Sequence, residues 1–458
     1  MLAGFAEKEF TPEKGNMPGE IGPYFASGTR TPLMAHAAVI TSGEKTAVFV
    51  SMDIIFITTA LSDRIKKKIS DAVSVPVENV LLACTHTHTG CGTDYQCWGT
   101  PAEPAAAELA GDMAVEAVKE AFANRIECTY GTGKGFETRY SFNRDWYMAD
   151  GRLRSNPGFK GDDLVAPFDT VDQSVHVMRI DSVEENRPKC FIVNYANHPD
   201  NHKKRDKFSA DYPGYLRLAL QRRFGRDVTV VFLNGTCGDV NDMDFKYRTS
   251  DVYRAHGLCP PEMIGEGLAE TVAKINANIT MKDEPFIGAA SEMQTTLRRH
   301  ATDEMRAWAK MIMDKKAAGE QMLEHSVLLA EQYLSEPAEM PATCEVEVHV
   351  MQVGDWAIVG LPGEIYTCIG TRIKANSPFP NTLVVELESG ANGYISPDVI
   401  QDCGAYEGIY STIAFTGHGT VDVLVNGATK MLNAMHKEYL DKTIGGVINR
   451  PVYISRKN

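Results

Sequence analysis

Residues 80–90 read VLLACTHTHTG, an apolar stretch that runs directly into two histidines. The continuous apolar run before the turn predicts a short strand that is covered on both faces. His86 and His88 stand two positions apart, so in an extended segment their side chains project to the same side. Such a pair at the end of a strand presents two imidazoles to one cavity, which suits zinc. The alternative is a pair of polar histidines in a surface turn.

Two further ligand-type side chains follow apolar strands elsewhere in the chain. His198 stands in an NHP sequence after residues 190–196 (CFIVNYA), and the proline disfavours helix at the histidine. Glu364 closes an LPGE sequence after the predicted strand 356–361 and before a predicted helix over 365–375. Taken alone, His198 could be a structural hydrogen-bonding residue. Glu364 could merely occupy the first helical turn, where the helix dipole favours a carboxylate.

His86, His198 and Glu364 together indicate a metal site more strongly than any one of them does alone. Each lies just past the end of a separate apolar strand, which is where open α/β folds place their sites. Two histidines and a carboxylate are a common catalytic zinc set that leaves positions open for water and substrate. The sequence therefore predicts a zinc site that includes His86, His198 and Glu364.

Strand-like and helix-like segments alternate along the first two-thirds of the chain. Residues 46–56 (TAVFVSMDIIF) are nearly all apolar and predict a buried strand, whereas residues 61–73 and 105–123 have helical patterns. A long helical stretch over 302–335 is expected to break near Gly319. We find no repeat and no linker that would mark a boundary. The sequence predicts one α/β domain over residues 1–458, with β-sheets in the core flanked by α-helices.

Composition excludes several classes of function. The chain has 458 residues, 43% of them hydrophobic and 23% charged, which is ordinary for a globular protein. Its formal charge of −14 argues against nucleic acid and against an anionic membrane surface as partners. No apolar run is long enough for a membrane span, and the first residues lack the features of an export signal. We therefore expect a cytoplasmic protein whose ten cysteines are mostly reduced.

The sequence resembles the neutral/alkaline (non-lysosomal) ceramidases. The resemblance runs in order along essentially the whole chain, and THTH together with LPGE is its most diagnostic part. It is carried by GFAEKEFTP, TPLMAHAAVI, THTHTG, NYANHP, SADYPGYL, NGTCGDVN, LPGE, NGYISP and AYEGIYS. The resemblance implies a layered sandwich like the ceramidase catalytic domain, dependence on Zn²⁺, and hydrolysis of an N-acyl amide bond by a metal-activated water. A role in sphingolipid metabolism would follow.

The resemblance also implies roles for individual residues. The implied zinc ligands are His86, His198, Glu364 and Tyr394. His88 would carry the proton beside the metal, and Arg144 and Tyr406 would hydrogen-bond the carbonyl oxygen or the developing oxyanion. Without the resemblance, Tyr394 reads as an aromatic residue packed beside a glycine-rich turn, and Arg144 as a surface ion-pair partner. Asp53 could orient a ligand histidine or cap the next segment.

The resemblance weakens in two places. The loop after THTH reads TGCGTDYQCW at positions 89–98, which departs from the family pattern beside the site, and no C-terminal β-rich domain is expected. The expected substrate is therefore a small-molecule or lipid N-acyl compound. One alternative is a zinc hydrolase of the same scaffold that cleaves an ester or glycoside of a small soluble substrate. Another is a non-catalytic binding protein, against which the presence of His88, Arg144 and Tyr406 argues.

Overall fold

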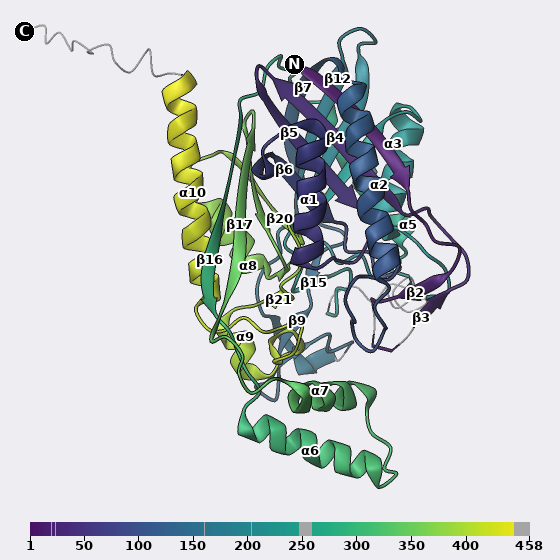
Figure 1. Ribbon diagram of the computed structural model, residues 1–458, viewed down its shortest axis with the longest axis vertical. Helices are drawn as coiled ribbons and strands as arrows, with labels where there is room; N and C mark the ends of the chain where they lie inside the picture. Colours follow the sequence, from purple (N-terminus) through teal and green to yellow (C-terminus); the bar gives the residue numbers. More distant parts are fainter. Residues whose placement is uncertain (20, 23, 160, 203, 247–258, 444–458) are drawn as a thin grey trace, which may run out of the picture.

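Two β-sheets lie face to face at the centre of the molecule (Figure 1). The computed structural model describes residues 1–443 except positions 20, 23, 160, 203 and 247–258, so positions 444–458 of the predicted single domain lie outside the described residues. In spatial order, the larger sheet consists of β14 (Thr229–Asn234), β13 (Arg187–Tyr195), β12 (Ser174–Ser182), β7 (Ile126–Phe136), β1 (Leu2–Glu9), β4 (Met34–Ser42), β5 (Lys45–Met52) and β6 (Val80–Cys84). The smaller sheet consists of β16 (Ile287–Leu297), β17 (Thr343–Val353), β18 (Trp356–Leu361) and β20 (Asn381–Glu386).

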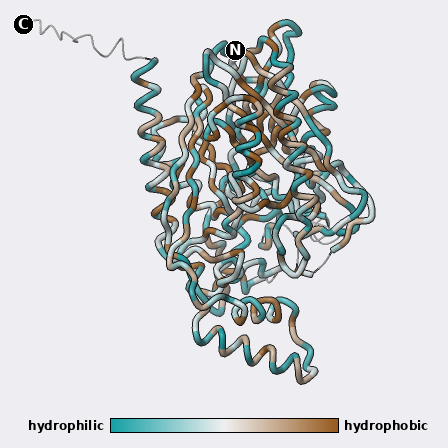
Figure 2. Tube along the Cα trace, viewed as in Figure 1, coloured by the Kyte–Doolittle hydropathy of each residue, from teal (hydrophilic) through white to brown (hydrophobic). Residues whose placement is uncertain are grey.

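Apolar side chains from both sheets form the central core. Phe49 and Ile192 of the larger sheet belong to the same buried cluster as Trp356 and Leu383 of the smaller one. The strands are apolar on both faces because each sheet also carries helices on its outer side. Figure 2 shows the hydrophobic segments concentrated in this part of the molecule.

Helices cover the outer face of each sheet. The larger sheet carries α1 (Thr59–Val73) and α2 (Pro104–Ala123) over one half, and α3 (Asp211–Phe224) and α5 (Pro261–Asn276) over the other. The smaller sheet carries α8 (Thr367–Asn376) and α10 (Thr420–Thr443). The layers therefore run helix, sheet, sheet, helix, and the expected core of β-sheets flanked by helices is confirmed.

Short elements complete the chain. The strands among them are β2 (Gly15–Met17), β3 (Tyr24–Ala26), β8 (Phe142–Asn143), β9 (Asp145–Met148), β10 (Leu153–Ser155), β11 (Leu164–Pro167), β15 (Val240–Asn241), β19 (Glu364–Ile365) and β21 (Tyr394–Ile395). The short helices are α9 (Asp398–Cys403), η1 (Val77–Asn79), η2 (Gly161–Asp163) and η3 (Tyr406–Gly408). Helices α6 (Asp303–Ala317) and α7 (Glu324–Ser335) form a hairpin below the main body (Figure 1).

Most neighbouring strands are antiparallel, which the alternation of strands and helices did not indicate. Within the two large sheets three pairs are parallel: β5 with β6, β13 with β14, and β18 with β20. His86 follows the second strand of the first pair, whereas His198 and Glu364 follow the first strand of the other two. The carboxyl ends of these pairs meet on one side of the sandwich, and there they bring the motifs together.

Two of the predicted segments have boundaries with a clear physical cause. The helical stretch divides at Gly319, whose φ of +86° favours glycine, so α6 ends at Ala317 and α7 starts at Glu324. The strand predicted over 46–56 ends earlier, at Met52, because the chain turns there and the backbone carbonyl of Ile55 faces a histidine of the site. Among the described helices, none combines the length and apolar character needed to cross a membrane.

Trp356 should be a main contributor to stability. Its side chain is 1% exposed in the cluster between the sheets, so replacing it with alanine leaves a large cavity. We expect Trp356→Ala to lower the free energy of unfolding by about 3–5 kcal/mol in chemical denaturation. Leu323→Ala is the control, since Leu323 is 77% exposed, and it should change stability little. Equal effects of the two substitutions would contradict the packing described here.

Candidate active site

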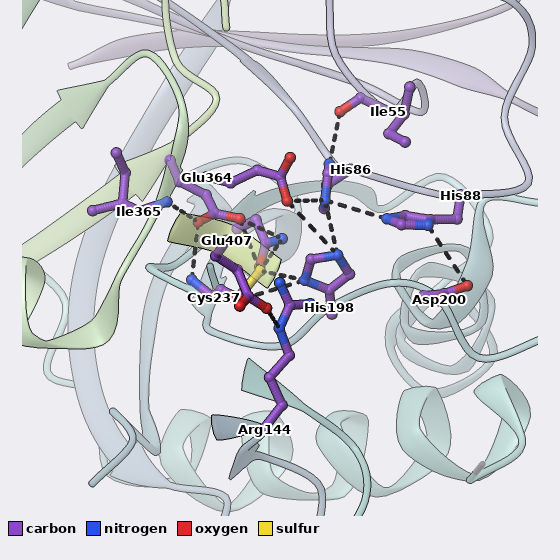
Figure 3. Close-up of polar contacts among 12 residues, drawn as sticks. Ile55, His86, His88, Arg144, His198, Asp200, Cys237, Glu364, Ile365 and Glu407 are labelled. Carbon is purple, nitrogen blue, oxygen red and sulfur yellow. Dashed lines mark hydrogen bonds and ion pairs between the residues drawn. The ribbon is translucent and has the colours of Figure 1, made fainter. Parts of the chain in front are cut away.

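Three histidine side chains converge at the carboxyl ends of the parallel pairs (Figure 3). The Nε2 atom of His86 lies 3.1 Å from Nε2 of His198 and 3.3 Å from Nε2 of His88. Each ring meets the others edge-on, with centroids 4.6–4.9 Å apart. Within the described residues, these three side chains are the one histidine, cysteine or carboxylate group with ligand atoms close enough to share a metal ion.

Backbone carbonyls orient two of the imidazoles. Nδ1 of His86 lies 3.0 Å from the Ile55 carbonyl oxygen, and Nδ1 of His198 lies 3.3 Å from that of Cys237. If each Nδ1–H donates to its carbonyl, each Nε2 keeps a lone pair that points to the centre of the cluster. His86 also has a φ of +69°, a strained conformation for a residue with a side chain. Such strain is typical of functional positions, and here it accompanies a ring directed at its neighbours.

Glu364 completes the cluster from the second sheet. Its Oε2 atom lies 3.4 Å from Nε2 of His86 and 3.9 Å from Nε2 of His198. Burial raises the pKa of this carboxyl group, but the His86 imidazole beside it more than compensates, so the net pKa is lowered. Oε2 is buried and makes no hydrogen bond of regular geometry within the described residues, although Nε2 of His86 is near it. An unpaired buried carboxylate oxygen is costly, and a cation between it and the imidazoles removes that cost.

A two-residue parallel ladder places Tyr394 beside Glu364. Strand β19 pairs with β21 so that these two residues are register partners. The Tyr394 ring is buried and lies 5.5 Å from the guanidinium carbon of Arg144. Burial, followed by the nearby Glu364 charge, raises the pKa of Tyr394 well above its usual value. Two imidazoles and a carboxylate are a donor set that fits zinc, and the Tyr394 phenol stands beside that carboxylate.

His88 faces the same centre as His86 and His198. Its Nδ1 lies 3.7 Å from a carboxylate oxygen of Asp200. Burial, helped by the neighbouring His86, holds the pKa of His88 well below the usual 6.5, so its imidazole is neutral at pH 7. The structure thus brings a third imidazole to the cluster, within reach of whatever the other donors bind.

Arg144 and Tyr406 line the same cavity as the histidines, which has a volume of about 300 Å³. Arg144 is 5% exposed and its Nε lies 2.7 Å from Oε1 of Glu407, so it is not a surface ion-pair partner. The Tyr406 ring stacks on Trp98 with centroids 5.4 Å apart. Trp98 belongs to the loop 89–98, which therefore forms part of the wall.

Sequence reasoning missed two carboxylates that support the site. Glu407 pairs with Arg144, and its place in the AYEG motif directly after Tyr406 was the available signal. Glu386, the last residue of β20, accepts hydrogen bonds from the backbone N–H groups of Cys237 (2.9 Å) and Ile365 (3.1 Å). Glu386 thereby joins two backbone segments that border the metal-binding cluster, and burial raises its pKa to about 7. No local motif indicated it.

Asp53 does not orient a ligand histidine. Its carboxylate lies 3.0 Å from the Arg217 guanidinium and accepts a hydrogen bond from the backbone N–H of Met34, also at 3.0 Å. That group belongs to a buried network between α3 and the sheet. The carbonyl of Ile55 is what contacts His86 instead.

Comparison with known proteins agrees with these features. Residues 24–242 match the family model of the neutral/alkaline non-lysosomal ceramidases, N-terminal domain. The resemblance to this family is confirmed. No curated protein matches the sequence.

Solved structures of ceramidases share the fold. The neutral ceramidase from Pseudomonas aeruginosa superposes with a TM-score of 0.68 at 15% identity, over 95% of this chain and 74% of its own. A ceramidase complexed with C2 superposes with a TM-score of 0.69 at 15% identity, over 95% of this chain and 75% of its own. At this level of identity the likeness establishes the layered fold.

Removing one imidazole should abolish metal binding. We expect the purified protein to hold about one zinc ion per chain and His86→Ala to hold almost none, because the remaining donors lose a ligand that the backbone orients. Metal content measured by mass spectrometry after dialysis checks this. His418→Ala is the matched control, since His418 is half-exposed on the surface and pairs with Asp402. Equal zinc content in the two variants would contradict the assigned centre.

Proposed function

We propose that this protein is a zinc-dependent hydrolase that cleaves an N-acyl amide bond. The observation that carries the proposal is the buried Oε2 atom of Glu364, which makes no hydrogen bond of regular geometry and faces the imidazoles of His86 and His198. A bound cation would stabilise this buried carboxylate, which the neighbouring side chains do not satisfy by regular hydrogen bonds. The family match over residues 24–242 supports the reaction class.

The residues that would hold the ion are His86, His198, Glu364 and Tyr394. A zinc ion bound there would polarise the scissile carbonyl and make a water molecule acidic enough to attack near neutral pH. Among the other groups that line the cavity, His88, Arg144 and Tyr406 are of the types that a hydrolysis needs for charge and proton transfer.

Arg144 and Tyr406 would stabilise charge on the carbonyl oxygen. Burial raises the pKa of Tyr406 well above its usual value, so its hydroxyl stays protonated and can donate a hydrogen bond. Burial disfavours the charge on Arg144, but the Glu407 carboxylate more than offsets this, so the pKa of Arg144 is raised and its guanidinium remains charged. Preformed donors of this kind stabilise a developing oxyanion at little reorganisation cost.

His88 would move the proton. In the overall reaction a water oxygen bonds to the carbonyl carbon, the C–N bond breaks, and the leaving nitrogen gains a proton. The neutral imidazole of His88 can take a proton from the water and deliver it to the nitrogen. Asp200 lies near its other ring nitrogen and would favour the protonated form during the transfer.

The substrate need not be a membrane lipid. The structure of a ceramidase complexed with C2 concerns the ligand of that protein and does not fix the substrate of this one. Here the cavity of about 300 Å³ is at the lower end of the range for drug-sized ligands, about 300–1,000 Å³. A compact N-acyl compound would fill this cavity alone, whereas a longer chain would extend into the adjoining cavities. Ester or glycoside cleavage on the same scaffold remains the competing function.

A substrate panel combined with metal removal tests the proposal. We expect hydrolysis of at least one N-acyl amide, loss of that activity with a chelator, and recovery on adding zinc. Glu364→Gln should reduce kcat/KM by at least about 10³-fold, since it removes the ligand charge. Cleavage of esters or glycosides alone would favour the competing function, and amide cleavage that survives complete zinc removal would refute the mechanism.

Glu407 should act by positioning Arg144. We expect Glu407→Gln to lower kcat by about 10- to 100-fold while zinc content stays the same, because a buried guanidinium loses its counter-charge. Glu438→Gln, which breaks only an exposed pair with Lys442, is the matched control. An unchanged kcat, or a loss of zinc in parallel with activity, would show that Glu407 has a different role.

A further inference from the structure

A second cavity of about 260 Å³ adjoins the candidate active site. It shares Phe56, Glu364 and Ile413 with the metal-binding cavity, so the two spaces lie on either side of these residues. Its remaining apolar lining comes from Leu387, Ala391 and Phe415. A group attached to the scissile amide could therefore extend into it.

Arg298 is also part of this lining. Its guanidinium lies over the Phe415 ring at 4.7 Å, and its buried Nε atom has no hydrogen-bond acceptor. Within the described part of the chain, no carboxylate lies within ion-pair distance of Arg298. The next residue differs, because Arg299 donates to the carbonyl oxygens of Gly408 and Ala414, each at 2.6 Å.

The charges around the cavity are unequal. Among the described lining residues, Arg298 is the single cation and Glu364 the single carboxylate. Glu364 faces the histidines and would be neutralised by the metal ion. The other polar groups are the hydroxyls of Thr58, Tyr95 and Thr412, and Thr58 already binds Asp94 through its backbone N–H at 3.0 Å. Among the lining residues an anionic ligand group would thus find one cation, Arg298, while the Asp94 carboxylate is held by the backbone N–H and the hydroxyl of Thr58.

The volume limits the length of the group. An apolar cavity of about 150 Å³ accommodates benzene, with six carbons. By the same measure, 260 Å³ accommodates roughly ten carbon-sized atoms. A longer acyl chain would extend past it, toward a neighbouring cavity of about 380 Å³ that shares Tyr95, Thr412 and Ile413 with it.

We propose that this cavity binds a short apolar substituent that ends in a carboxylate, and that Arg298 is the residue that selects it. The inference rests on the proposed amide hydrolysis and narrows its substrate class. The carboxylate could belong to the acyl half, as in a half-amide of a dicarboxylic acid, or to the amine half, as in an N-acyl amino acid. A guanidinium pairs with either in the same way.

Paired substrates test the role of Arg298 in turnover. In the acyl arm, glutaryl p-nitroanilide is compared with pentanoyl p-nitroanilide. In the amine arm, N-hexanoyl-leucine is compared with N-hexanoyl-leucinamide. We expect the carboxylate member of one arm to have a kcat/KM about 10- to 100-fold above its neutral partner. The arm that responds identifies the source of the carboxylate.

Arg298→Met removes the charge and keeps a similar length. We expect this variant to lose the carboxylate preference and to cleave the neutral partner within about threefold of the wild-type rate. Lys430→Met is the matched control, since Lys430 is exposed and pairs only with Glu292 on the surface. A missing preference in both arms, or one that survives in Arg298→Met, would overturn the inference.

Binding separates this inference from the proposed function. Calorimetry would compare hexanoate with hexanamide on the wild type and on Arg298→Met. Any carboxylate bound at the metal contributes to both proteins, so the difference between them reports Arg298. We expect hexanoate to bind about tenfold more weakly to the variant. That result without amide cleavage would defeat the proposed function alone, whereas cleavage with no such difference would defeat the inference alone.

Discussion

The buried carboxylate of Glu364, one oxygen of which makes no regular hydrogen bond, is the constraint on which the candidate site depends. His86, His198 and Glu364 each follow a strand of a different parallel pair, and the ends of these strands bring the three side chains together. Neither imidazole makes a regular hydrogen bond to Oε2 of Glu364. A protein interior tolerates such a group poorly unless a cation completes it. The metal centre therefore explains why ligand-type residues from distant parts of the chain share one point.

Much of the surrounding structure holds the segments that carry His86, His198 and Glu364 in place. Carbonyl groups orient two of the imidazoles, and Glu386 joins the backbone of the Cys237 turn to β19. Strained backbone accompanies this arrangement, with positive φ at His86 and at Leu387 and Ser389 after β20. The buried Lys66 donates to the Ser389 hydroxyl at 2.7 Å and so braces this last turn from α1.

The sequence could predict the parts of the site that local patterns mark. His86, His198 and Glu364 each follow an apolar strand, and that pattern sufficed to propose that they meet. Tyr394 could be named only through the resemblance, because its position depends on a two-residue ladder with Glu364. Arg298 and Glu386 had no local signal, since their neighbours come from distant segments. The alternation of helices and strands in the sequence likewise did not predict that most neighbouring strands are antiparallel.

Anomalous diffraction at the zinc edge would show whether these side chains share one ion. We expect one peak about 2.0–2.2 Å from Nε2 of His86, Nε2 of His198 and a carboxylate oxygen of Glu364. A zinc-loaded crystal in which these side chains are ordered but share no peak would contradict it, and the enzyme assignment would lose its physical basis.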